Sequence, residues 1–234
     1  MDKTIFKING NVKVKSKILL ESWRSFINEN TDSSPISEER VIGLVPMSAK
    51  PFHEGHMSLI RKASDECDEV IIYVSTSDRK RKGEITIFGE DMKYIWENIL
   101  QRSINEKFPN VRFEYGGSPV RKVYEKLEEA NDIQTNNVYR VYSDAKDTVK
   151  NYPAKYIELH FGDLYSRGKV LFPAKESPEL FTRGDGAPDI SGTIMRSYLS
   201  NASEDKFLFL DNLPDEISPD DKEEIFNILF SRLN

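Results

Sequence analysis

The chain of 234 residues is long enough for one substantial domain, and 38% hydrophobic with 31% charged residues is typical of a globular protein rather than a disordered or fibrous one. No apolar run has the length of a membrane helix and the first residues lack the pattern of a secretory signal, so we expect a cytoplasmic protein that spans no membrane. The net charge is −6, but residues 201–234 carry nine acidic and three basic side chains; residues 1–200 are therefore neutral, which excludes the chain-wide basic field of nucleic-acid binders.

The pattern of the first 39 residues predicts an N-terminal appendage, a β-hairpin and a helix that precede the main domain. Two alternating runs, 4–8 and 11–15, flank Asn9-Gly10, the dipeptide that best supports a type I′ turn. This pattern predicts a β-hairpin. Apolar residues at helical spacing then predict a helix over 16–29.

Beyond this appendage, short β-rich apolar runs alternate with helical stretches. The pattern predicts strands at 41–46, 69–75, 111–115 and 138–142, and helices at 56–67, 89–107 and 118–130. Ser118-Pro119 supports the third helix start, because serine caps helices and proline suits their first position. Such alternation implies parallel strands joined by crossover helices. The predicted fold is α/β: a doubly wound, Rossmann-like parallel sheet with helices on both faces.

The signals weaken after residue 150. They predict strands at 155–160 and 168–172 and helices at 193–200 and 218–233. We therefore divide the chain into the N-terminal appendage (1–39), a central domain (40–200) and an acidic helical segment packed on that domain (201–234).

The loop after the first predicted strand carries two of the three histidines. His53 and His56 lie between that strand and the next helix, at the sheet edge where open parallel sheets bind ligands. Gly55 lets a phosphate approach the helix N-terminus, and imidazoles can donate hydrogen bonds to its oxygens. A metal site and a purely structural pair are the alternatives. His160 is distant, and the single cysteine, Cys67, provides no zinc-binding pair.

A second segment, 189–196, opens a helix with small and hydroxyl residues. Ser191 or Thr193 can simply cap that helix. Arg196, one turn later, adds a two-pronged donor for an anion. Two such anion sites at one sheet edge suit a triphosphate.

Four adjacent bases, 79–82, follow the second predicted strand and so lie at the same sheet edge. Either they form a solvated turn, or Arg79 and Arg81 reach a phosphorylated ligand. The sequence contains no Walker loop, complete dinucleotide fingerprint or nucleophile elbow.

The residues His53-Glu54-Gly55-His56 and Ile190-Ser191-Gly192-Thr193-Ile194-Met195-Arg196 resemble the HxGH and ISGTxxR signatures of the nucleotidylyltransferase superfamily. The resemblance covers roughly residues 40–200. The lead-in Pro51-Phe52-His53 and the Ser-Gly-Thr motif are most similar to nicotinamide mononucleotide adenylyltransferases.

The resemblance implies that three residues are catalytic: His53, His56 and Arg196. It implies that seven more bind the nucleotide: Ser48, Lys50, Phe52, Gly55, Ser191, Gly192 and Thr193. Two positions depart from the family pattern, because Met47 replaces a glycine and Lys50 replaces a glutamine or aspartate.

The activity implied by the resemblance is transfer of AMP from ATP to a phosphorylated acceptor, preferably nicotinamide mononucleotide, giving NAD and pyrophosphate. Magnesium is the implied cofactor, brought with ATP and without side-chain ligands. The alternatives are a cytidylyltransferase or a phosphopantetheine adenylyltransferase of the same fold, and a non-catalytic nucleotide-sensing protein. We expect no nucleic-acid or membrane partner, and a homo-oligomer is compatible with the sequence.

Overall fold

The computed structural model describes residues 39–133, 135–172 and 188–232. The predicted N-terminal hairpin and helix lie outside these residues. Within them, no helix combines the length and the apolar character needed to cross a bilayer.

Five parallel strands form one sheet in the order β3-β2-β1-β4-β5. Their bounds are Val41–Met47 for β1, Glu69–Val74 for β2, Val111–Tyr115 for β3, Val138–Val141 for β4 and Val170–Leu171 for β5. These strands confirm the four predicted before residue 150 and the one predicted at 168–172. β1 and β2 read as continuous apolar runs because both faces of the sheet are buried.

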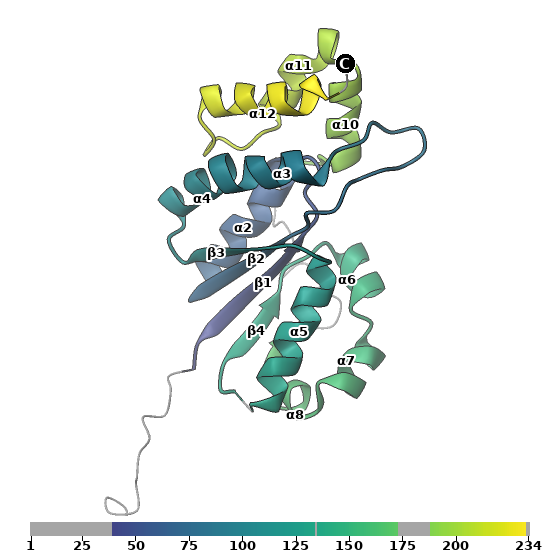
Figure 1. Cartoon of the computed structure of the whole chain (residues 1–234). Helices are drawn as coiled ribbons and strands as arrows, with labels where there is room; N and C mark the ends of the chain where they lie inside the picture. The colour runs from purple at the N-terminus through teal and green to yellow at the C-terminus, as the bar shows by residue number, and fades with distance from the viewer. Residues whose placement is uncertain (1–38, 134, 173–187, 233–234) are drawn as a thin grey trace, which may run out of the picture. The chain divides into compact units, whose positions relative to one another are not determined.

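Helices cover both faces of the sheet, as predicted (Figure 1). One face packs against α2 (Glu54–Glu66), α3 (Gly89–Ile95), a π-helical turn η1 (Trp96–Leu100) and α4 (Gln101–Lys107). Beyond these helices lie α10 (Gly192–Ser200), α11 (Ala202–Asp211) and α12 (Pro219–Ser231), which pack on one another and, through α12, on α3 (Figure 1). The other face packs against α5 (Pro119–Asp132), α7 (Ala154–His160) and α8 (Gly162–Ser166), and α6 (Ala145–Asn151) follows β4. Side chains alternate between the two cores along each strand: Val45 joins the first and Leu44 the second.

The predicted helices are confirmed with changes at their ends. The helix predicted at 89–107 is α3, η1 and α4 in succession, with its middle turn widened to π geometry. At the start of α5, the Ser118 hydroxyl accepts a hydrogen bond from the Arg121 N–H (3.4 Å), and Pro119 occupies the first helical position.

The strand predicted at 155–160 is wrong, because this segment is the helix α7. In the structure Ile157 and Phe161, four positions apart, are buried on one helical side, while Leu159 is exposed. The helices α6, α8 and α11 were not predicted; in α11 the consecutive apolar residues 207–210 hide the helical period.

Ion pairs tie the start of α2 to the C-terminal segment. Arg61 donates hydrogen bonds to both carboxylate oxygens of Glu216, each at 2.7 Å, and also contacts Glu54. The hydrogen bond with Glu216 raises the pKa of Arg61. In addition, the Glu54 N–H donates to the Asn212 carbonyl at 2.9 Å. Residues far apart in sequence thus hold the helix that carries the two histidines.

We predict that Gly89→Ala destabilises the protein by about 3 kcal/mol or more, because overpacking against an immovable backbone is costly. A Cβ at Gly89 would lie 1.9 Å from the carbonyl oxygen of Thr76, and the Gly89 N–H is bound to Asp78 at 2.9 Å. Urea unfolding measures the effect.

Gly83→Ala is the matched control for this substitution. Gly83 lies in open space at φ +81°, so alanine should cost only about 1 to 2 kcal/mol there. Equal stability losses in the two variants would contradict the predicted close approach at Gly89.

Candidate functional site

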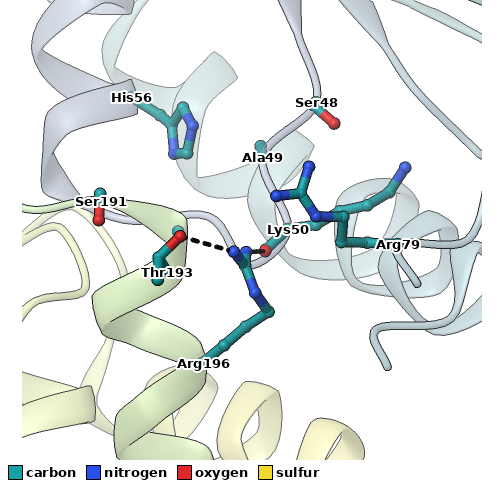
Figure 2. Close-up of a pocket in the computed structure, with 9 residues that line it drawn as sticks. Ser48, Ala49, Lys50, His56, Arg79, Ser191, Thr193 and Arg196 are labelled. Atoms are coloured by element: carbon teal, nitrogen blue, oxygen red, sulfur yellow. Dashed lines mark hydrogen bonds between the residues drawn. The ribbon is translucent and has the colours of Figure 1, made fainter. Parts of the chain in front are cut away.

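A pocket of about 170 Å³ opens at the carboxyl edge of the sheet. From β1 the chain builds β2 and β3 on one side and then returns through α5 to place β4 on the other side. Ligands of open α/β sheets bind where the strand order reverses in this way. The pocket is lined by Ser48, Ala49, Lys50, His56, Arg79, Ser191, Gly192, Thr193 and Arg196 (Figure 2).

The loop from β1 to α2 supplies three consecutive lining residues, 48–50. Ala49 adopts φ +41°, a left-handed conformation that costs a non-glycine residue about 1 to 2 kcal/mol. Met47 lies within β1 and is buried, so the loop turns sharply at Ala49 rather than at the position where the family has glycine. Sequence reasoning missed Ala49, and no pattern marks it.

The start of α2 brings His53 and His56 together. The His53 carbonyl accepts hydrogen bonds from the N–H groups of His56 (2.8 Å) and Met57 (3.3 Å), and the two imidazole centroids are 3.8 Å apart. His56 lines the pocket, whereas His53 is 1% exposed and does not. His53 therefore packs behind His56.

Phe52 and Gly55 support the histidines without lining the pocket. The Phe52 ring is stacked on His56, with centroids 5.7 Å apart, and meets Trp96 edge-on at 5.0 Å. Both Phe52 and Gly55 are buried. The stacked Phe52 ring restricts where His56 can point.

The second motif forms the start of α10, on the opposite wall. Ser191 caps the helix by accepting a hydrogen bond from the Ile194 N–H at 3.3 Å, as the capping interpretation predicted. Arg196 is 4% exposed; it donates to the Lys50 carbonyl at 2.6 Å and to the Thr193 hydroxyl at 2.9 Å. Figure 2 shows its guanidinium between the main chain at Lys50 and the Thr193 side chain. Arg196 therefore joins the second motif to the loop that leads into the first.

Gly192 permits this close approach. A Cβ there would lie 3.0 Å from Nη1 of Arg196 and 3.3 Å from the Lys50 carbonyl oxygen. A side chain at position 192 would therefore crowd the Arg196 guanidinium and the Lys50 carbonyl.

The basic segment after β2 folds back as a loop. Main-chain hydrogen bonds join Arg79 to Ile87 in both directions, at 2.8 and 3.1 Å. Arg79 lines the pocket, whereas Arg81 is exposed and is not among its lining residues. Sequence reasoning also missed Glu84, in the same loop, whose carboxylate accepts a hydrogen bond from Arg196 Nε at 2.8 Å.

Among the described residues, three cationic side chains line the pocket: Lys50, Arg79 and Arg196. Burial lowers the pKa of Arg196 from its ordinary value, an effect that Glu84 opposes, and burial likewise lowers the pKa of Arg79. Both guanidinium groups stay charged at any physiological pH. In the described ranges, no carboxylate lines the pocket and no three His, Cys, Asp or Glu residues gather as metal ligands. The arrangement suits a polyanion.

Lys50 is the most unusual of these cations. Its side chain is buried, and its ammonium group donates a hydrogen bond to the Ser75 hydroxyl at 2.9 Å. Burial lowers the pKa of Lys50 to about 8; Asp78 raises it and Arg79 lowers it by smaller amounts. The charge on this side chain is therefore lost as the pH rises through about 8.

We predict an alkaline limb near pH 8 in kcat/KM for the nucleotide, because kcat/KM reports groups of the free enzyme and protonated Lys50 attracts the phosphates. In kcat the limb should move to higher pH, since bound phosphates favour the charged lysine. Lys50→Met should lower kcat/KM at neutral pH and abolish the limb. Lys82→Met, an exposed lysine outside the pocket lining, is the control. An unchanged limb in Lys50→Met would show that another group titrates.

Comparisons with known proteins agree with this geometry. Residues 42–87, which span β1, α2, β2 and the basic loop, match the family described as the Citrate lyase ligase C-terminal domain. Two proteins named nicotinamide-nucleotide adenylyltransferase, from Methanococcus maripaludis strains S2 and C5, are similar to the chain. They are 28% and 29% identical to it over 125 residues, which cover 52% of this chain and 70% of each relative.

These similarities extend the inference from the two motifs. The family match contains His53 and His56, and Arg196 of the second motif meets the same loop. The two motifs, the family match and the two relatives together support an enzyme of the nucleotidylyltransferase superfamily, and the chain is similar to the nicotinamide-nucleotide adenylyltransferases.

Proposed function

We propose that this protein transfers the adenylyl group of ATP to the phosphate of nicotinamide mononucleotide, forming NAD and pyrophosphate. The observation that carries the proposal is the meeting of the two motifs: His56 at the start of α2 lines one pocket together with Ser191, Gly192, Thr193 and Arg196 at the start of α10. The named activity of the relatives from Methanococcus supports the choice of ATP and of the acceptor.

The proposed reaction is an in-line displacement at the α-phosphorus of ATP. An oxygen of the acceptor phosphate forms a bond to that phosphorus, and the bond from the phosphorus to the bridging oxygen of the β-phosphate breaks. Pyrophosphate leaves with the electron pair. The protein provides positioning and charge stabilisation rather than a nucleophile of its own.

Each pocket residue has a role in this scheme. His56 donates a hydrogen bond to phosphate oxygens as negative charge grows in the transition state. The Ser191, Gly192 and Thr193 segment and Arg196 hold the β- and γ-phosphates at the start of α10, where N–H groups and the helix dipole favour anions. Lys50 and Arg79 line the same pocket, so in this scheme their positive charges attract the phosphates of the nucleotide.

ATP enters this scheme as its magnesium complex. Magnesium prefers oxygen ligands and keeps several waters, and it neutralises phosphate charge when bound. The hydroxyl-lined pocket fits a metal that arrives on the substrate. In this scheme Ser48 and Thr193, which line the pocket, would contact its water shell.

Pyrophosphate release tests the proposal across a matrix of the four common nucleoside triphosphates and three acceptors: nicotinamide mononucleotide, phosphopantetheine and glycerol phosphate. We expect release with ATP and nicotinamide mononucleotide. Release only with CTP and glycerol phosphate, or only with ATP and phosphopantetheine, would assign one of the alternative transferases. ATP binding without any release would favour a nucleotide sensor.

A further inference from the structure

Glu84 does not line the pocket itself, but its carboxylate contacts two residues that do, Arg196 and Arg79. Its Oε2 accepts a hydrogen bond from Arg196 Nε at 2.8 Å and lies 2.8 Å from Arg196 Nη2. The same oxygen lies 3.8 Å from Nε of Arg79. One carboxylate thus faces two of the three cations that surround the pocket.

The guanidinium of Arg196 has few donors left for a ligand. Of its five N–H groups, one donates to the Lys50 carbonyl, one to the Thr193 hydroxyl and one, on Nε, to Glu84, whose same oxygen also lies 2.8 Å from Nη2. The edge formed by Nε and Nη2 is one of the edges with which arginine binds a phosphate bidentately. In this structure that edge faces Glu84.

The position of the Glu84 side chain also allows it to move away from Arg196. It lies in the loop closed by the Arg79–Ile87 hydrogen bonds, and its side chain is 22% exposed. The Lys50 carbonyl, which binds the guanidinium from another side, belongs by contrast to a buried residue. A phosphate that approaches Arg196 therefore competes with Glu84 first.

We propose that Glu84 is an internal counter-ion: it occupies the phosphate position of Arg196 in the free protein and gives it up when a triphosphate binds. This inference rests on the proposed function insofar as the ligand is a triphosphate. Because the ligand must displace Glu84 from Arg196, its apparent affinity is lower than it would be without Glu84. Glu84 thereby favours ligands with several negative charges over singly charged ones, and it keeps the buried Arg196 paired while the pocket is empty.

The test measures binding of inorganic tripolyphosphate, and separately of magnesium-ATP, by calorimetry to wild type, Glu84→Gln and Glu90→Gln. Glu84→Gln removes the competing charge and should bind tripolyphosphate about tenfold more tightly or better, the fold-change expected when a charged hydrogen bond need not be broken. Glu90→Gln removes the same charge from a glutamate that pairs with Arg232, outside the pocket lining, and should stay within about twofold of wild type. Equal or weaker binding by Glu84→Gln, including no binding by any of the three proteins, would overturn the proposal.

Thermal unfolding provides a second readout. Without ligand, Glu84→Gln should melt below wild type, because the buried Arg196 loses its charged partner. Saturating tripolyphosphate should raise the melting temperature of Glu84→Gln more than that of wild type, as tighter binding requires. A smaller rise would contradict the proposal. Neither measurement involves an acceptor or turnover, so a failure of the proposed adenylyl transfer and a failure of this inference are distinguishable.

Discussion

Replacing His56 with alanine should lower the turnover number by at least about a hundredfold, because a preorganised donor at developing charge contributes roughly 3 to 4 kcal/mol. His56 is the histidine that lines the pocket, and Phe52 and His53 hold its ring. The measurement is the steady-state rate of pyrophosphate release at saturating magnesium-ATP. His53→Ala should also lower turnover, but with a loss of stability, because His53 is buried behind His56.

His160→Ala is the matched control for this prediction. His160 is the third histidine of the chain, is exposed and lies in α7, on the opposite face of the sheet. Its removal should leave turnover unchanged. Unchanged turnover in His56→Ala, with the fold intact by circular dichroism, would remove the imidazole from the mechanism.

Arg196→Lys should raise the Michaelis constant for ATP about tenfold or more while changing that for the acceptor less. Lysine keeps the charge, but its single nitrogen cannot serve the Lys50 carbonyl, Thr193 and a phosphate together. Each lost charge-assisted hydrogen bond is worth about 1.5 to 3 kcal/mol. Initial rates with each substrate varied in turn give the two constants.

Arg81→Lys, the same substitution at an exposed arginine outside the pocket lining, is the control and should match wild type. An effect of Arg196→Lys confined to the acceptor would place Arg196 in the other subsite.

The sheet was predictable from sequence because its strands are buried on both faces. A strand such as β2 is a run of apolar and β-branched residues, and no helical stripe competes with that pattern. The start of α5 was predictable for a local reason as well, since Ser118 and Pro119 act within one turn. Both features depend only on residues that are neighbours in the chain.

Features that depend on tertiary contacts escaped prediction. The burial that makes α7 a helix comes from Ile157 and Phe161 packing in the second core, which a seven-residue segment does not reveal. The left-handed backbone at Ala49 and the buried position of Lys50 depend on packing around the loop. Glu84 and Arg196, 112 positions apart, meet only once the sheet has brought both to one edge.

In the candidate site, too, features set by local sequence were predicted and features set by tertiary contacts were not. The two motifs and their order predicted that His56 and Arg196 act together, and the structure brings both to one pocket. The sequence patterns did not separate His56 from His53, although only His56 lines the pocket. Which residue of a motif faces the cavity depends on how the helix is rotated, and in α2 the contacts of Glu54 with Asn212 and of Arg61 with Glu216 contribute to that rotation.

The most direct measurement follows the phosphates of ATP through the reaction. The protein is incubated with magnesium, nicotinamide mononucleotide and ATP radiolabelled at the α-phosphate or, in a parallel reaction, at the γ-phosphate. Adenylyl transfer predicts that the α-label appears in NAD and the γ-label in pyrophosphate, with both products lost in His56→Ala. The appearance of the γ-label in the nucleotide product, or of the α-label in free AMP alone, would contradict the account.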